Sequence, residues 1–288
     1  MKQTKRTRCL VEAALLVALA TVLSVLKVAE LPYGGSITLA SMLPIVLLAY
    51  RNGILWGLGG GFVYAALQQL LGLNNLSYFT TWQSIVAIIL LDYILAFTVV
   101  GLGGIFRRTV KNQALSLAAG SLLVCVLRYV CHVISGATVW AGLSIPSAAA
   151  LSYSFIYNAT YMLPEAIVLI AVAYYLGTLL DFRKEQPVRL VRDHTAPAEV
   201  NLLGVIAGLF ALIGVAVDVA LIFPQLQNAE SGEFDVTGLK VELFADSFWL
   251  PVVIVTAVCA LICAALLYAR YRLKTAAQNE AAEQKENA

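Results

Sequence analysis

Charged residues are scarce in this chain: Asp, Glu, Lys and Arg make up 12% of its 288 residues, whereas hydrophobic residues make up 60%. This composition excludes an ordinary water-soluble domain, because such domains carry about 25% charged residues. The formal net charge of +2 does not favour nucleic acid as a partner, since nucleic-acid-binding domains have a strong basic excess. We therefore expect an all-α integral membrane protein, because separate apolar segments cross a lipid bilayer as helices.

Catalytic and metal-binding motifs are also missing. The sequence has no GxxxxGK[ST] phosphate-binding loop, no HExxH and no GxSxG motif, and it contains only two histidines, His132 and His194. The five cysteines lie in apolar segments without a CxxC pair, so they predict neither a disulfide framework nor a zinc site. We expect no enzymatic activity, no ATPase within this chain and no bound metal or cofactor.

Long apolar runs are what the chain has instead, and eight of them have the composition of a membrane span. The second, over residues 37–50, holds only about 14 residues and contains Pro44, so its length equally allows a re-entrant or interfacial segment. The first follows the basic sequence MKQTKRTR without a convincing cleavage site, which favours a retained helix over a signal peptide. The predicted spans are residues 9–29, 37–50, 53–73, 82–106, 114–136, 148–180, 201–223 and 247–269.

Basic residues predict the orientation, because cytoplasmic loops of membrane proteins carry an excess of Lys and Arg. If the eight spans alternate, the basic residues near their ends fall on one side, and both termini are cytoplasmic. The opposite loops are neutral or, between the last two spans, acidic. The basic set is Lys2, Lys5, Arg6, Arg8, Arg51, Arg107, Arg108, Lys111, Arg183, Lys184, Arg189, Arg192, Arg270, Arg272 and Lys274, and the acidic set is Glu230, Glu233, Asp235, Glu242 and Asp246.

A polar and basic segment with two prolines, residues 184–199, interrupts the apolar runs. We expect it to be a cytosolic linker between a six-helix membrane domain, residues 1–183, and a two-helix transmembrane extension, residues 200–274. Residues 275–288 are polar and predict a solvated or frayed tail.

Four ionisable side chains stand out within the predicted spans: Asp92, Arg128, His132 and Glu165. Such residues are costly in a bilayer and usually face a bundle interior or a water-filled cavity. Arg128 and His132 are four residues apart and therefore share one face of a helix. Asp92 needs a cation beside it, which either Arg128 or a cationic ligand can supply. The first alternative is a structural salt bridge between two helices, and the second is a binding site.

Aromatic and amide side chains lie near these charges, toward the predicted outer side. Tyr153, Tyr157 and Asn158 lie on neighbouring turns of the sixth span, Tyr93 lies in the fourth span, and Trp140 follows the fifth span near the predicted outer boundary. For each residue alone, a belt of interfacial aromatics or a helix–helix hydrogen bond is an alternative interpretation. Together with a carboxylate and an imidazole, these side chains suit a flat aromatic cation. The sequence therefore predicts a pocket for a small molecule.

Four stretches resemble, in this order along the chain, the thiamine-specific substrate-binding (S) component of bacterial energy-coupling factor (ECF) transporters. They are GGSITLASMLPIVLLAYRNG, LLDYILAF, LRYVCHVISGATVW and SYSFIYNATYMLPE, within a similarity that covers about residues 8–182. The resemblance implies a six-helix bundle in the bacterial cell membrane that binds thiamine from outside. It also implies two kinds of partner, a transmembrane coupling protein and a pair of ABC-type ATPases, which alone use ATP.

The resemblance further implies site residues, by their positions in these motifs. The implied ligand-binding residues are Asp92, Tyr93, His132, Trp140, Tyr153 and Asn158. Arg128, Tyr157 and Glu165 are candidate supporting residues. Ala14 and Ala18, an AxxxA pair in the first span, resemble the face that docks the coupling protein, with ordinary helix packing as the alternative. Some members of the family have tryptophan where this chain has Gly35, at the lid of the pocket, and others have glutamate where it has Asp92.

Other functions stay open at this point. A related S component for another vitamin or a thiamine precursor would differ only in the shape of its pocket. A membrane-embedded enzyme would use His132 and Asp92 as acid and base. A structural subunit would bind no ligand and would use Asp92 and Arg128 as a salt bridge. The two additional C-terminal spans lie outside the usual length of the family, and partner binding or stability would account for them.

Overall fold

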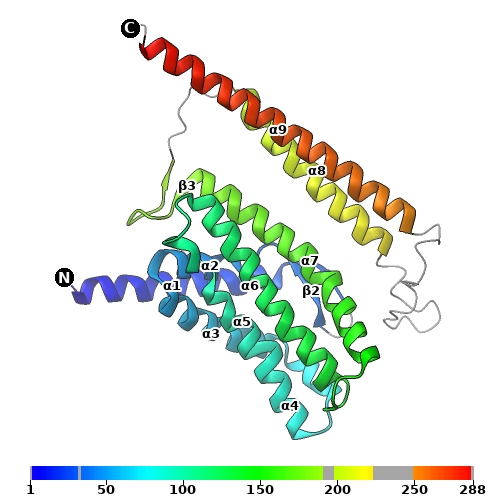
Figure 1. Ribbon diagram of the computed structural model, residues 1–288. Coiled ribbons are helices and arrows are strands. Elements are labelled where there is room, and N and C mark those ends of the chain that lie inside the picture. Colours follow the sequence, from blue (N-terminus) through cyan, green and yellow to red (C-terminus); the bar gives the residue numbers. More distant parts are fainter. Residues whose placement is uncertain (1, 32–33, 191–197, 223–248, 287–288) are drawn as a thin grey trace. The chain divides into compact units, whose positions relative to one another are not determined.

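The computed structural model describes residues 2–31, 34–190, 198–222 and 249–286, which are helical for most of their length (Figure 1). Two short antiparallel sheets of two strands each are the extended elements of this part. The chain divides into two compact units, Met1–Leu190 and Val191–Ala288. Each unit is described below by itself.

The first unit is a bundle of long helices with a small hairpin after the first of them. In chain order its main elements are α1 (Lys2–Val25), β1 (Lys27–Glu30), β2 (Ser36–Thr38), α2 (Leu43–Asn52), α3 (Ile54–Leu71), α6 (Gln113–Ser135) and α7 (Ala148–Leu179). The 3₁₀ turn η2 (Leu73–Tyr78) follows α3, and the strands β3 (Leu180–Asp181) and β4 (Val188–Arg189) follow α7. Helices α6 and α7, drawn in green in Figure 1, pack side by side along the bundle.

The segment between α3 and α6 is helical but changes its type repeatedly. It consists of α4 (Trp82–Ile88), the π-helical turn η3 (Ile89–Leu95), α5 (Ala96–Thr98) and the 3₁₀ turns η4 (Val99–Leu102) and η5 (Ile105–Arg107). A second π-helical turn, η6 (Gly136–Trp140), continues α6. A π-helical turn contains about one residue more than an α-helical turn, and such turns are frequent at functional sites.

Seven helical segments in the described part of the chain are long and apolar enough to cross a membrane. They are Arg6–Val25, Ile54–Leu71, Trp82–Arg107, Gln113–Trp140, Ala148–Leu179, Leu202–Ile222 and Trp249–Ala277. These segments correspond to seven of the eight predicted spans. The all-α membrane fold predicted from the composition is therefore confirmed.

The exception is the second predicted span, over residues 37–50. Helix α2 has ten residues, a length of about 15 Å, and is too short for a hydrocarbon core of about 30 Å. It starts late because Ser36–Thr38 pair with β1 as β2, and Pro44 then occupies the first turn of the helix. The prediction of a helix across 37–50 is thus wrong. The chain nevertheless crosses back toward the end of the unit where α1 begins. This is shown by Arg51 in the last turn of α2, which contacts Glu12 of α1.

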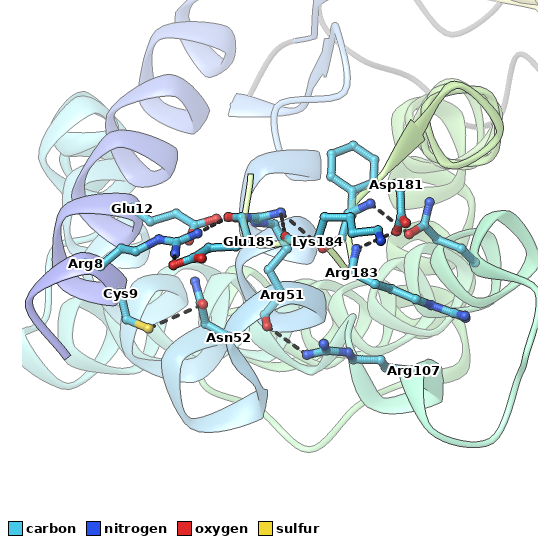
Figure 2. A network of polar contacts seen from close by, with 12 residues as sticks. Arg8, Cys9, Glu12, Arg51, Asn52, Arg107, Asp181, Arg183, Lys184 and Glu185 are labelled. Carbon is cyan, nitrogen blue, oxygen red and sulfur yellow. Dashed lines mark hydrogen bonds and ion pairs between the residues drawn. The ribbon is translucent and has the colours of Figure 1, made fainter. Parts of the chain in front are cut away.

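A network of polar contacts closes this end of the first unit (Figure 2). The Arg51 guanidinium binds the Glu12 carboxylate and donates to the carbonyl oxygens of Phe182, Lys184 and Glu185, which follow α7. Arg8 pairs with the Glu185 carboxylate. The Arg51 carbonyl in turn accepts a hydrogen bond from Arg107 Nη1 at 2.7 Å. Arg183 binds the Tyr50 hydroxyl and the Lys111 carbonyl. Basic residues from four separate segments therefore lie together at this end of the first unit.

Close packing of the bundle depends on glycine where α3 crosses η4. A Cβ atom on Gly57 would lie 2.4 Å from the carbonyl oxygen of Gly101, and one on Gly101 would meet the Gly57 backbone at 2.3 Å. Since real Cβ contacts are not this short, the two backbones can approach only because neither residue has a side chain. The glycine at position 57 therefore serves close packing of α3 within the bundle.

The second unit contains two long helices, α8 (Ala198–Ile222) and α9 (Trp249–Glu286), which pack against each other. Thr256 Oγ1 on α9 donates to Asp218 Oδ2 on α8 at 2.7 Å, and Cys263 Sγ lies 3.1 Å from the Ala207 carbonyl oxygen. Helix α9 continues to Glu286, past the end of the predicted two-helix extension at residue 274, because the residues that follow are mainly Ala, Gln, Glu and Lys, which favour helices. The predicted acidic loop, His194 and residues 191–197 of the predicted linker lie outside the described residues.

Candidate ligand-binding site

The first unit encloses a cavity of about 720 Å³. Its wall includes the ends of α1 and α3 (Ser24, Gly72), the turn η6 (Trp140) and the first turn of α7 (Ala150), so it lies toward the end opposite the basic network. Strand β2 and the π-helical turn η3 complete the wall. The volume is within the range of about 300–1,000 Å³ typical of small-molecule sites.

Asp92 is the centre of a polar cluster in this cavity. Its Oδ1 lies 2.9 Å from His132 Nδ1, and its Oδ2 accepts a hydrogen bond from Trp140 Nε1 at 3.1 Å. Asp92 belongs to η3 and Trp140 to η6, so both π-helical turns contribute to the cluster. The structure thus brings together three of the residues that the sequence predicted for ligand binding.

The contact with Asp92 determines how His132 presents its other nitrogen. A carboxylate only accepts hydrogen bonds, so Nδ1 of His132 carries the hydrogen that points at Asp92. In the neutral imidazole Nε2 is then an acceptor. Nε2 is buried and has no hydrogen-bond partner among the described residues, and His132 lines the cavity. A ligand that donates a hydrogen bond would satisfy this atom.

The other charges around the cavity are paired. Lys27 Nζ lies 2.6 Å from Glu30 Oε1, and Arg128 Nη1 lies 2.9 Å from Glu165 Oε2. Asp92 differs from the other described charged residues that line the cavity, because its partners are the Trp140 indole and the His132 imidazole and not a permanent cation. With His132 neutral, the wall carries one net negative charge, and this favours a singly charged cation.

The salt bridge between Asp92 and Arg128, one of the two alternatives, does not form. Arg128 instead binds Glu165, and its guanidinium carbon lies 4.3 Å from the centre of the Phe97 ring. Arg128 is 7% exposed and Glu165 is 2% exposed, so this is a buried ion pair between α6 and α7. The sequence placed Glu165 among the supporting residues but did not identify it as the counter-ion. Asp92 is therefore left available for the second alternative, a cationic ligand.

Aromatic side chains surround the cluster. Trp140 packs against the rings of Tyr78 and Phe79, with centroid distances of 5.7 and 4.8 Å. Tyr93 stacks on Phe97, and its hydroxyl accepts from Asn75 Nδ2 at 2.9 Å and donates to the Gly72 carbonyl at 3.3 Å. These contacts fix Trp140 and Tyr93 before any ligand arrives.

Two tyrosines of α7 form a second aromatic face. The rings of Tyr153 and Tyr157 are nearly parallel, with an interplanar angle of 4° and centroids 6.2 Å apart. The Tyr157 hydroxyl accepts a hydrogen bond from the Gly35 amide at 3.3 Å. A Cβ atom on Gly35 would lie 2.8 Å from Tyr161 Cδ1, so a large side chain at this position requires Tyr161 to move. At Gly35 the wall of the cavity therefore consists of backbone that packs against Tyr157 and Tyr161.

Asn158 uses its amide within the protein. Its Nδ2 donates to the Ser154 carbonyl at 2.8 Å and to the His132 carbonyl at 3.3 Å, and its Oδ1 accepts from the Tyr161 hydroxyl at 2.6 Å. The side chain thereby joins α7 to the turn of α6 that carries His132. Asn158 lines the cavity, but in this arrangement its immediate role is to hold His132 in place.

Several polar residues of the cavity were not identified from the sequence. Asn75 holds the Tyr93 hydroxyl, and Thr38, Ser41 and Tyr64 form a buried hydrogen-bonded chain next to Glu165. These residues are single polar positions beside apolar runs, and neither charge nor periodicity selects them, although Thr38 and Ser41 lie in the first of the four stretches that resemble the family. Among the described residues, no group of three or more His, Cys, Asp and Glu side chains could hold a metal ion.

The AxxxA pair lies on the outer surface of the first unit. Ala14 and Ala18 are exposed, whereas Ala13, Val17 and Ala20 on the opposite face of α1 are buried in the bundle. The alternative of packing inside the bundle is therefore wrong for Ala14 and Ala18. Their face is free to contact another helix.

Comparison with known sequences decides the family. Residues 10–182 match the family model described as Thiamine transporter protein (Thia_YuaJ), which is more than half of the chain. The chain belongs to this family. The matched region lies entirely in the first unit and contains the whole cavity wall. The recognition of a thiamine transporter from the four motifs is confirmed, and its family performs transport rather than catalysis.

Two curated members of the family are similar to this chain over most of their own length. The thiamine transporter ThiT of Bacillus subtilis is 35% identical over 179 residues, which cover 58% of this chain and 89% of the relative. ThiT of Lacticaseibacillus paracasei is 28% identical over 195 residues, covering 62% and 91%. A solved structure of ThiT from Listeria monocytogenes has a TM-score of 0.49 at 24% identity, covering 60% of this chain and 94% of that one.

Proposed function

We propose that this protein binds thiamine in the cavity of the first unit and is the substrate-capture subunit of an ECF-type importer. The single observation that carries the proposal is the Asp92 carboxylate in an aromatic cavity, where it is held by His132 and Trp140 and not by a permanent cation. This cavity occurs in a chain of the thiamine transporter family.

The chemistry of thiamine matches the groups that line the cavity. Thiamine joins an aminopyrimidine, which donates and accepts hydrogen bonds, to a thiazolium ring, which carries one positive charge. Asp92 offsets that charge, and the faces of Trp140, Tyr153 and Tyr93 attract the cationic ring through their quadrupoles. His132 Nε2 is a buried acceptor for an amine or hydroxyl of the ligand. Tyr157 and Asn158 hold the wall in its ligand-binding shape.

The orientation follows from the gathering of basic residues at one end of the first unit. Lys and Arg are enriched on the cytoplasmic side of membrane proteins, so the end that holds Arg8, Arg51, Arg107 and Arg183 faces the cytoplasm. The cavity, at the opposite end, then takes up thiamine from outside the cell. By the same rule, both termini are cytoplasmic.

Release of the bound vitamin is assigned to partners: a transmembrane coupling protein and two ABC-type ATPases. The exposed Ala14 and Ala18 on α1 allow a second helix to approach closely, and we propose this face for the coupling protein. Ala14→Trp should abolish uptake of labelled thiamine by cells that express the complete importer, while purified protein still binds thiamine. Unimpaired uptake by this variant would refute the docking face.

The proposed ligand is tested by titrating the detergent-purified protein with thiamine while following tryptophan fluorescence. We expect saturable quenching that is weakened in Trp140→Phe and unchanged in Trp82→Phe, because Trp82 is 71% exposed and does not line the cavity. Competition with the pyrimidine moiety of thiamine and with riboflavin then separates thiamine from other vitamins. A folded protein that does not respond to thiamine would refute the assignment of the ligand.

A further inference from the structure

The buried ion pair between Arg128 and Glu165 has a third member. Glu165 Oε2 binds Arg128, and its other oxygen, Oε1, accepts a hydrogen bond from Thr38 Oγ1 at 2.8 Å. Thr38 is the last residue of β2, is 4% exposed and lines the cavity. Glu165 therefore connects α6, α7 and the strand that forms part of the cavity wall.

The direction of this hydrogen bond is fixed by its partners. The positive charge of Arg128 balances the negative charge of the Glu165 carboxylate, and an ionised carboxylate only accepts hydrogen bonds. The hydrogen of the Thr38 hydroxyl therefore points at Glu165. Thr38 Oγ1 also lies 2.7 Å from Ser41 Oγ, to which the Tyr64 hydroxyl donates at 3.3 Å. The hydroxyl groups thus form a chain from α3 through the turn after β2 that ends on the Glu165 carboxylate.

Strand β2 is attached to α7 at a second point. The Gly35 amide, next to the start of β2, donates to the Tyr157 hydroxyl at 3.3 Å. Tyr157 and Glu165 are eight residues apart on α7, a rise of about 12 Å along a helix. Gly35 and Thr38 are three residues apart on an extended chain, which spans about 10 Å. The two spacings agree, so β2 runs alongside α7 and is fastened to it at both ends.

We propose that Glu165 is a positioning residue for ligand retention, because it fastens β2 to α7 through Thr38 and so holds this wall of the cavity closed around the ligand. The inference rests on the proposed function, since it assigns a role in the thiamine site. Arg128 supplies the counter-ion that keeps Glu165 in place as an acceptor. Loss of the hydrogen bond from Thr38 should loosen β2 and speed dissociation of the ligand. The association rate should change little, because variants of one binding site differ mainly in their dissociation rates.

Thr38→Val is the most direct test, because valine has the shape of threonine without the hydroxyl, and the ion pair of Arg128 and Glu165 stays intact. Dissociation of thiamine, followed by fluorescence after rapid mixing with excess competitor, should be about three- to tenfold faster, the size expected for one hydrogen bond. Thr38→Ser, which keeps the hydroxyl, should restore the wild-type rate. The matched control is Thr21→Val, whose hydroxyl binds only the Val17 carbonyl of its own helix.

The outcomes separate this inference from the proposed function. Faster dissociation in Thr38→Val, with rescue by serine and an unchanged unfolding temperature of the ligand-free protein, supports the positioning role. Equal dissociation rates in Thr38→Val and wild type overturn it while thiamine binding stands. A slower association together with a lower unfolding temperature of the ligand-free protein also overturns it, because the bond would then be merely structural. Failure of the wild-type protein to bind thiamine refutes the proposed function itself.

Discussion

The two units of this chain are both made of apolar, membrane-length helices, yet they differ in what they bury. In the apolar window of α6, 44% of the residues are buried, compared with 6% in α9. The first unit contains the cavity and the buried pair of Arg128 and Glu165, and it also contains the entire family match. In this chain, buried polar side chains therefore distinguish the unit that holds the cavity, as expected for polar groups that face the interior of a membrane bundle.

The two membrane-embedded aspartates illustrate the same difference. In the first unit, Asp92 lines a cavity and is held by His132 and Trp140. In the second unit, Asp218 accepts a hydrogen bond from Thr256 near the end of α8. One carboxylate faces a space that a ligand can enter, and the other joins two helices.

The largest expected effect is on stability, in the buried ion pair of the first unit. Arg128→Gln leaves Glu165 buried without its cation and should lower the free energy of unfolding by about 3–5 kcal/mol. Arg272→Gln in the second unit, where the side chain is exposed, should change it by less than about 0.5 kcal/mol. Unfolding in detergent, followed by circular dichroism, measures both. Equal losses in the two variants would remove the distinction between the units.

The next largest effect is on ligand binding. Asp92→Asn removes the negative charge but keeps the shape, and thiamine affinity should fall about 10- to 100-fold, as for loss of a charged hydrogen-bonding partner. Asp218→Asn is the matched change in the second unit and should leave the affinity unaltered. Fluorescence titration of both variants measures the ratio, and a similar loss in the two would contradict the placement of the site.

A smaller effect is expected at the basic end of the first unit. Arg51→Met removes the contacts with Glu12 and with the carbonyls that follow α7, and should cost about 1.5–3 kcal/mol of unfolding free energy. Thiamine affinity should stay within about threefold, because the cavity lies toward the opposite end. Arg108→Met, at an exposed neighbouring position, is the control for loss of charge alone. A large loss of affinity in Arg51→Met would show that the two ends are coupled.

The smallest effect is expected from removing the second unit. A chain that ends at Leu190 retains the whole cavity wall and the whole family match. Its thiamine affinity should therefore equal that of the full chain within about threefold, a difference of less than about 0.7 kcal/mol. Isothermal titration of the two proteins side by side decides this. A much weaker affinity of the shorter chain would assign the second unit a part in binding.

The membrane class, the family and most spans could be predicted from the sequence, because they depend on composition and on motifs that are local. Asp92, His132 and Trp140 could also be selected, since each is an unusual residue in an apolar run. Their mutual contacts could not be predicted. A regular helix over residues 82–106 gives no indication of a π-helical turn at Asp92, and the assignment of Arg128 to Glu165 rather than Asp92 depends on how three helices pack.

The short helix α2 shows the same limit in the fold. An apolar run over residues 37–50 predicts a span by composition. The predicted end of this span lies next to Arg51, and in the structure Arg51 is in the last turn of α2. That its first residues would instead pair as β2 and line a cavity depends on long-range contacts with α7, such as the bond between Thr38 and Glu165. Single polar residues of this kind carry no periodic signal.

The π-helical turn η3 makes the length of its helix a fixed property of the protein. A π-helical turn holds about one residue more than an α-helical turn, so deleting one residue between Ile89 and Leu95 would turn η3 into an ordinary α-helical turn. The helical parts on either side would keep their relative orientation, whereas the residues of the turn itself, Asp92 among them, would rotate. Asp92 would then lose its position beside His132 and Trp140, while the residues after it would stay packed against α3. The length of η3 therefore sets the direction in which Asp92 points, independently of how the helical parts on either side pack in the bundle.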